Sequence, residues 1–512
     1  MSAQKNNILA ELDIDNLQNS GLAGPSDVPG FLRLHKRRLH VSSDSEHGDL
    51  ALGGLDNPDM EHTFTTIPQR LISYQTLIYF GLTSERADTI WSAWKNWPAT
   101  GPQRDLLPDN QDTDGGGSSR NNDSGGLLVP FLDFVVGRVV PTYAVDVDSR
   151  HDDDAWAACL DACGVNDALK TAIMDPTFRC IRQTESCRWW LRDTLTMRYA
   201  GLEEIQRASL QRATDIRLAI DDTDGTITLG GRENNRRSGA PGKSRSSAQS
   251  AATPSHHRQL SLSEVQQAAA PGVSKRHWSR DTANEVANKP NHVILYKGMD
   301  QARLDGFWRQ NADANNNHDD DDDGDLGNWR VETLLSFPPT NFSGQHALFY
   351  FMPDARVAEY YAAYAKRRSS CESVVVVAVT IKTADLHELE EMNDETGAAK
   401  TFRLYYPSPH WKQLVWRSKN ARAFPKPLRK YRDAVLLIGT ATKGAQRSFQ
   451  SMATWEEITS DNVLRIPESN PNPAIQYVFH AETGGEFLRK SAQFEVFPMS
   501  NADAAAVVVP DE

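Results

Sequence analysis

The chain has few cysteines and no long apolar run. Only five of its 512 residues are cysteine, an odd number without paired CxxC motifs. We therefore expect a reducing compartment and buried thiols, not a disulfide framework or a structural zinc site. No segment approaches the ~18 consecutive apolar residues of a spanning helix, and the N-terminal residues lack the basic start and apolar core of a secretory signal. These absences predict an intracellular protein, cytoplasmic or nuclear, that does not enter a membrane.

Excess positive charge and the commonest catalytic motifs are also missing. The 68 acidic residues outnumber the 55 basic ones, giving a net charge of −13, which disfavours nucleic acid as a partner. No Walker loop, GxSxG elbow or HExxH helix occurs. The run of aspartates at 319–323 could hold a hard cation, but it lacks the spacing of a calcium loop and is typical of an extended, self-repelling loop. We therefore expect no metal.

The residues that are present predict a helical domain near the N-terminus. The 39% of hydrophobic residues, with 12 Trp, are enough for sizeable cores, although a mean hydropathy of −0.55 predicts much solvated chain. Residues 1–65 are rich in Gly, Asp, Ser and Asn without a sustained period, and we expect them to be mostly disordered. Residues 66–220 keep helical spacing, for example in a helix that begins at Thr83 or Ser84 and carries Trp94 on its core face. We expect an all-α domain there that packs or binds a protein partner.

A linker and a second domain follow. Residues 221–288 are rich in Ser, Gly, Ala and Arg, which is typical of a disordered linker. After residue 292, short runs of Val, Ile, Tyr and Phe alternate with helical segments such as 355–368. The sequence thus predicts a multidomain protein, with an α+β domain over residues 289–500 and a tail over 501–512.

The order of motifs in the α+β region is informative. A strand ending in LYKGM (295–299) precedes NFSGQHALFYFMPDARVAEYYAAYA (341–365) and an apolar strand at 374–381. A helix-like segment (411–422), DAVLLIGTATKG (433–444) and IQYVFHAETGGEFL (475–488) come next. Over about residues 292–490, this order resembles the ADP-ribosyltransferase-like fold. The architecture of the whole chain resembles uncharacterised fungal proteins.

The resemblance implies a split two-sheet fold with NAD bound in the cleft between the sheets. It places Lys297 and Gly298 where the family holds the ribose or phosphate side of the cofactor. It places Tyr350 where an aromatic ring stacks on nicotinamide, and Gln476 near the position of the catalytic Glu of active enzymes. Breaking the nicotinamide–ribose bond develops positive charge, which a preorganised anion beside the ribose stabilises.

Two of these positions depart from the family pattern. Gln476 carries no charge, and Lys297 lacks both the planar fork of Arg and the acceptor nitrogen of neutral His. Glu482 or Glu486 could replace the missing carboxylate, or both could be solvated charges around the turn at 484–485.

Three functions stay open. The first is an NAD-binding ADP-ribosyltransferase or NAD glycohydrolase with weak or degenerate catalysis. The second is a non-catalytic scaffold, in which the helical domain and a degenerate transferase fold both bind proteins. The third is an unrelated α+β enzyme whose residues converge only in space.

Overall fold

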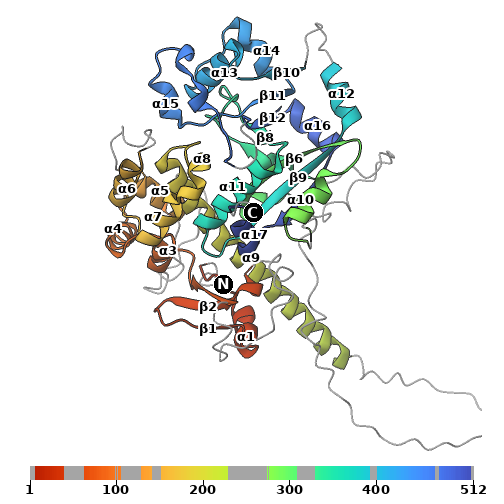
Figure 1. Ribbon diagram of the computed structural model, residues 1–512. Coiled ribbons are helices and arrows are strands. Elements are labelled where there is room, and N and C mark those ends of the chain that lie inside the picture. Colours follow the sequence, from red (N-terminus) through yellow and green to blue (C-terminus); the bar gives the residue numbers. More distant parts are fainter. Residues whose placement is uncertain are drawn as a thin grey trace, which may run out of the picture.

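Figure 1 shows a computed structural model of the chain. It describes residues 6–39, 63–98, 100, 102–104, 128–140, 152–228, 274, 276–307, 329–391, 400–467 and 472–508, apart from the side chains of 37 and 221–228. A helix-rich part precedes a strand-rich part, which confirms an α+β protein. Among the described residues, no helix combines the length and apolar character that a membrane span requires. The aspartate run at 319–323 and residues 229–273 of the predicted linker lie outside the described residues.

The N-terminal segment is folded, so the prediction of disorder over residues 1–65 is wrong for residues 6–39. It contains α1 (Glu11–Asn19), β1 (Ala23–Pro25), β2 (Phe31–His35) and the 3-10 turn η2 (Lys36–Arg38), and β2 also pairs with β3 (Phe64–Pro68) in an antiparallel sheet. The buried Asp13 carboxylate fixes α1, because it accepts from Ser209 Oγ (2.5 Å) and from Arg212 Nε and Nη2 (3.0 and 2.9 Å). Such long-range contacts leave no periodic signal in the local sequence. The sheet also makes the predicted all-α domain a mixed one.

Short helices pack around one long helix in the rest of the helical part. They are α3 (Tyr74–Tyr79), α4 (Ser84–Lys95), α5 (Phe131–Val139), α6 (Asp153–Ala162), α7 (Asp167–Met174), η5 (Pro176–Phe178), α8 (Arg179–Arg182) and α9 (Cys187–Thr228), with the two-residue strands β4 (Gln103–Arg104) and β5 (Leu128–Val129). The start of α4 is as expected, since the Thr83 side chain accepts from the Arg86 N–H and Trp94 is fully buried. The predicted end at residue 220 is wrong, because α9 continues to residue 228.

A three-stranded antiparallel sheet begins the strand-rich part. Its order is β13 (Ala492–Pro498), β9 (Val374–Lys382) and β6 (His292–Asp300), and α11 (Ala355–Arg368) packs against β6. The helix α10 (Arg280–Ala287) lies before β6, within the segment predicted as linker, and the Ser279 side chain caps it. Residues 501–506 form α17 (Asn501–Ala506), so the prediction of a tail is wrong there. Its apolar residues join the core beside α11, which a short alanine run could not predict.

A five-stranded sheet adjoins the first one. Its order is β10 (Thr401–Leu404), β11 (Leu436–Thr440), β12 (Ile475–His480), β8 (Leu348–Phe351) and β7 (Leu335–Ser336), and only the β10–β11 pair is parallel. The sheets meet where the Tyr296 N–H donates to the Met352 carbonyl at 2.7 Å. Around them lie η6 (Gln301–Leu304), η8 (Val331–Leu334), α12 (Thr383–Glu391), α13 (Pro409–Lys419), η9 (Lys426–Leu428), α14 (Arg429–Arg432), α15 (Gln446–Gln450), η10 (Trp455–Glu457), η11 (Ser460–Asn462) and α16 (Thr483–Ser491).

The two faces of the five-stranded sheet belong to different cores. Phe349, Phe351 and Phe479 meet Val377 and its neighbours in the core between the two sheets. Residues of the other parity, such as Leu348 and Val478, pack with Trp411 and Leu414 of α13. Alternation along each strand therefore decides which side chains share a space.

A third core joins the helical part to the strand-rich part, which the sequence did not predict. It combines α3 to α9 with α11, α17 and one face of β6 and β9, and Figure 1 shows α11 lying between the helical part and the strands. The Tyr364 hydroxyl of α11 donates to the Ile173 carbonyl at 2.9 Å. Arg368 donates to Asp193 Oδ2 at 2.9 Å, and its guanidinium lies over the rings of Trp190 and Tyr364. The two parts are therefore packed together.

Candidate functional site

Gln476 lies near the start of β12 and is fully buried. Its Oε1 accepts a hydrogen bond from Asn341 Nδ2 at 3.0 Å. Its Nε2 has no hydrogen-bond partner among the described residues. A buried donor without an acceptor costs about 1–3 kcal/mol. This N–H group therefore either destabilises the fold or donates to an acceptor that is not part of the polypeptide.

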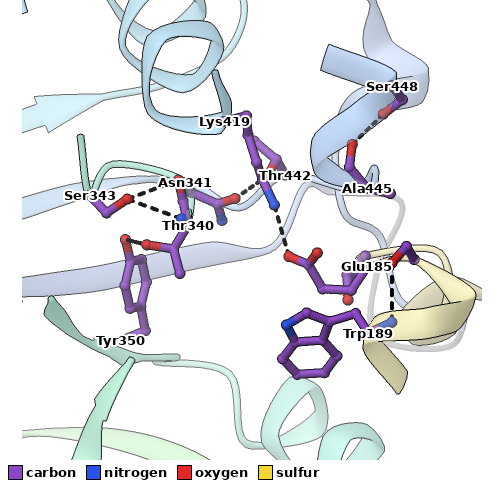
Figure 2. Close-up of polar contacts among 12 residues, drawn as sticks. Glu185, Trp189, Thr340, Asn341, Ser343, Tyr350, Lys419, Thr442, Ala445 and Ser448 are labelled. Atoms are coloured by element: carbon purple, nitrogen blue, oxygen red, sulfur yellow. Dashed lines mark hydrogen bonds and ion pairs between the residues drawn. The ribbon is translucent and has the colours of Figure 1, made fainter. Parts of the chain in front are cut away.

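Polar side chains connect Gln476 to Tyr350. Asn341 Oδ1 accepts from the Thr442 hydroxyl, and the neighbouring Thr340 Oγ1 lies 2.5 Å from the Tyr350 hydroxyl. We call these five residues, Thr340, Asn341, Tyr350, Thr442 and Gln476, the Gln476 cluster; Figure 2 shows four of them labelled. Burial raises the pKa of Tyr350 well above its usual value, so the phenol stays neutral and its oxygen is held by the turn at 340–342.

The structure thus brings together two of the residues that the sequence singled out. Tyr350 pairs with Val478 on β12, and Gln476 lies two residues from Val478 on the same face of the sheet. That face is the one covered by α13.

The side chain of Lys297 does not lie on the sheet face that carries Tyr350 and Gln476. It alternates along β6 with Gly298, so its side chain points into the core between the sheets, where its Nζ donates to the Leu334 carbonyl at 2.6 Å and lies 3.3 Å from Ser336 Oγ. Burial and the nearby Arg303 guanidinium lower the pKa of Lys297 to about 7. An amine that is only partly charged at neutral pH, and that points away from the Gln476 cluster, is a poor holder for the phosphate of a ligand at that cluster.

Gly298 serves helix packing. A Cβ at this position would lie 2.0 Å from the Ala358 carbonyl oxygen and 2.7 Å from the Ala362 nitrogen of α11. The glycine therefore lets α11 approach the backbone of β6, and that side of the strand is covered by the helix.

The two alternative carboxylates lie beyond the far end of β12. Glu482 and Glu486 are exposed, at the start of α16. Four residue steps separate Gln476 from the last residue of β12, His480, which corresponds to about 13 Å along an extended strand. Neither glutamate is placed to supply the charge missing at Gln476.

An ion pair beside the cluster went unnoticed in the sequence. Lys419, the last residue of α13, donates from Nζ to Glu185 Oε1 at 2.9 Å across the boundary between the two parts. The exposed ring of Trp189 lies beside them in Figure 2. Lys419 ends a helix and Glu185 lies in the bend between α8 and α9, where charged residues are common, and only a signal of long-range contact could have paired them.

The described residues also form two hollows and contain buried thiols. A hollow of about 10 Å³ is lined by His346, His480 and other residues. One of about 390 Å³ is lined by Gly30, by residues between 69 and 75 and by Trp91 of α4. Neither is lined by Tyr350 or Gln476. The described residues include no group of His, Cys, Asp and Glu that could hold a metal ion. All five cysteines are free thiols, and Cys159, Cys163 and Cys187 are buried.

The Gln476 cluster can therefore donate and accept hydrogen bonds but has no anion of its own. Such a set suits hydroxyl or amide groups of a ligand better than it suits the stabilisation of a cation. No family model matches the chain, and no curated protein or solved structure shows significant similarity to it.

Proposed function

We propose that the strand-rich part is an ADP-ribosyltransferase-like module that binds NAD or a related dinucleotide at the Gln476 cluster, with little or no catalysis. The observation that carries the proposal is the convergence of Tyr350 and Gln476, 126 positions apart, on one face of one sheet, with Gln476 Nε2 left as a buried donor. A ribose hydroxyl or the nicotinamide carbonyl would give that donor its acceptor.

We expect weak catalysis because the Gln476 cluster has no negative charge of its own. Cleavage of the nicotinamide bond needs an anion close to the developing positive charge. Gln476 offers an amide whose oxygen already accepts from Asn341. The nearby carboxylate of Glu185 is paired with Lys419, so its field at the cluster is largely compensated.

The direct test is binding and turnover of NAD by the full chain. We expect NAD in the millimolar range to raise the melting temperature, and nicotinamide release to stay close to the uncatalysed rate. A ligand at 100 times its Kd stabilises a protein by about 2.7 kcal/mol, which is easily measured. Gln476→Ala should remove most of this shift, because it removes the unpaired donor. No shift with the unchanged chain would contradict NAD binding.

Gln476→Glu tests whether only the charge is missing. The variant should gain nicotinamide release if the cluster binds NAD in a productive pose. It should also unfold more easily, because a carboxylate would be buried without a positive partner. Gln301→Glu is the matched control, since Gln301 is also buried but contacts Glu204 outside the cluster. It should lose stability without gaining turnover.

The second candidate is a non-catalytic protein scaffold. The observation in its favour is the core shared by the helical and strand-rich parts, which makes one body with a large continuous surface. Under this alternative, NAD leaves the melting temperature unchanged and Gln476→Glu gains no turnover. The same two measurements therefore separate the candidates.

A further inference from the structure

The ion pair between Lys419 and Glu185 stands out because both charges lie at the boundary of the two parts. The side chain of Lys419 is 3% exposed and that of Glu185 is 20% exposed, with 2.9 Å between Nζ and Oε1. A pair taken out of water costs desolvation energy that hydrophobic residues of similar size would avoid. Its presence at this place therefore calls for an explanation other than stability.

The pair is next to the Gln476 cluster. Ser418, which precedes Lys419, accepts from the Gly344 N–H through Oγ at 3.0 Å, and so ties the end of α13 to the turn that carries Asn341. Figure 2 shows the ion pair in one close-up with Asn341 and Thr442, with Trp189 of the helical part beside Glu185. Lys419 is thus the buried cation on the side of the cluster, whereas Lys297 points into the core between the sheets.

We propose that Lys419 is the phosphate-binding cation of the nucleotide site and that Glu185 occupies it until a phosphate of the dinucleotide displaces the carboxylate. The inference rests on the proposed function and adds both the charged contact and a regulatory role for the helical part. A carboxylate and a phosphate oxygen accept from an ammonium group in the same way. The same Nζ can therefore exchange one anion for the other without moving far.

The exchange links the ligand to the contact between the two parts. Binding of the phosphate separates Glu185 from Lys419, so any change that weakens the Glu185 contact must strengthen nucleotide binding by the same free energy. Trp189 lies on the next turn of the same segment, and its ring packs edge-to-face on Trp190 at 4.7 Å between centroids. Its exposed face is available to a planar base once the carboxylate has moved.

The test measures the affinity of the full chain for ADP-ribose and NAD by calorimetry, in the unchanged protein and in Glu185→Gln. We expect Glu185→Gln to bind about 5- to 150-fold more tightly, the usual range for coupling between sites. Lys419→Met should bind more weakly. Because Glu185→Gln is expected to gain affinity, partial unfolding cannot imitate the result. Asp175→Asn is the matched control, as the Asp175–Arg367 pair (2.8 Å) also joins the two parts but lies outside the cluster; its affinity should equal that of the unchanged chain.

The outcomes separate this inference from the proposed function. Tighter binding by Glu185→Gln, with Asp175→Asn unchanged, supports the exchange. Equal or weaker binding by Glu185→Gln overturns the exchange and leaves the proposed function intact. Absence of binding in both the unchanged chain and Glu185→Gln overturns both. Equal gains in Glu185→Gln and Asp175→Asn overturn the exchange as well, because general loosening of the two parts would then explain them.

Discussion

Gly298→Ala gives the sharpest test of how β6 and α11 fit together. The added Cβ would lie 2.0 Å from the Ala358 carbonyl oxygen, 2.7 Å from the Ala362 nitrogen and 2.9 Å from the Ala362 Cβ. All three separations are well below van der Waals contact, and two involve backbone atoms of a helix interior. The helix cannot give way by changing a rotamer, so α11 has to move away from the strand as a whole.

The expected cost follows from overpacking. Extra methyl groups in a packed core cost about 1–3 kcal/mol, and clashes with rigid backbone belong at the upper end, near 3 kcal/mol. For a cooperative unit of 150–250 residues this corresponds to a fall in melting temperature of about 6–12 °C. Gly137→Ala in α5 is the matched control, since a Cβ there meets no atom within 4 Å. It should stabilise the protein by about 0.5–1 kcal/mol, because alanine suits a helix interior better than glycine.

The assay is equilibrium unfolding in urea with both variants, together with amide exchange of the backbone of α11. We expect Gly298→Ala to lower the midpoint and to speed exchange in α11 first, whereas Gly137→Ala moves the midpoint slightly upward. A Gly298→Ala variant as stable as the unchanged chain would refute the close approach of α11 to β6. It would also reopen this glycine as a place where a cofactor approaches the backbone.

Three further side chains, one acidic and two basic, allow simpler tests. Asp13→Ala should release α1 from Arg212, at a cost of about 3–5 kcal/mol for a broken buried pair, and expose residues 6–39 to limited proteolysis; the exposed Asp15→Ala should not. Lys297→Met should be more stable than the unchanged chain below pH 7. Below pH 7 the lysine carries its proton in both the folded and the unfolded chain, although the folded site lowers its pKa to about 7. As the pH rises from 7 toward 10.5, the folded chain releases this proton while the unfolded chain still binds it, so the free energy of unfolding of the unchanged chain increases. The extra stability of Lys297→Met should therefore shrink over this range. If urea unfolding gives a constant difference in the free energy of unfolding between the two proteins over this range, the lowered pKa of Lys297 is contradicted. Arg368→Lys should lower the midpoint of unfolding, because lysine lacks the planar guanidinium that lies over Trp190 and Tyr364 and donates from Nη1 to Asp193 and Thr194. An unchanged midpoint would contradict the importance of this contact between the two parts.

The local features of the fold were predictable from the sequence. Short runs rich in Val, Ile, Tyr and Phe located β6, β8, β9, β11 and β12, and the cap at Thr83 located the start of α4. These signals come from residues that are neighbours in the chain, so each element reports its own pattern. The N-terminal segment failed for the same reason. The pairing of β2 with β3 and the Asp13 contact depend on residues from position 64 onward, so the sequence of residues 6–39 alone does not predict them.

Local sequence patterns could predict only part of the candidate site. The resemblance singled out Tyr350 and Gln476 separately, and the pairing of β8 with β12 together with the alternation along each strand brings them to one face of the sheet. The same alternation turned Lys297 toward the opposite core, a result that depends on the pairing between Tyr296 and Met352 and hence on where the sheets meet. A shift of one residue in the register of β6 would have turned Lys297 out of this core and its neighbours in the strand into it.

The cation that we propose for the nucleotide phosphate lies outside the sheet that carries Tyr350 and Gln476. Lys419 and Glu185 are 234 positions apart and belong to parts that the sequence assigned to separate domains. Each ends or follows a helix in which charged residues are ordinary, so neither attracts notice until the shared core brings them together. If Glu185 holds Lys419 in the absence of ligand, the helical part is a component of the binding site, and removing residues 6–228 would change nucleotide affinity even in a fragment that still folds. Under this proposal, nucleotide binding has to be compared between such a fragment and the full chain, because only the full chain contains the competing carboxylate of Glu185.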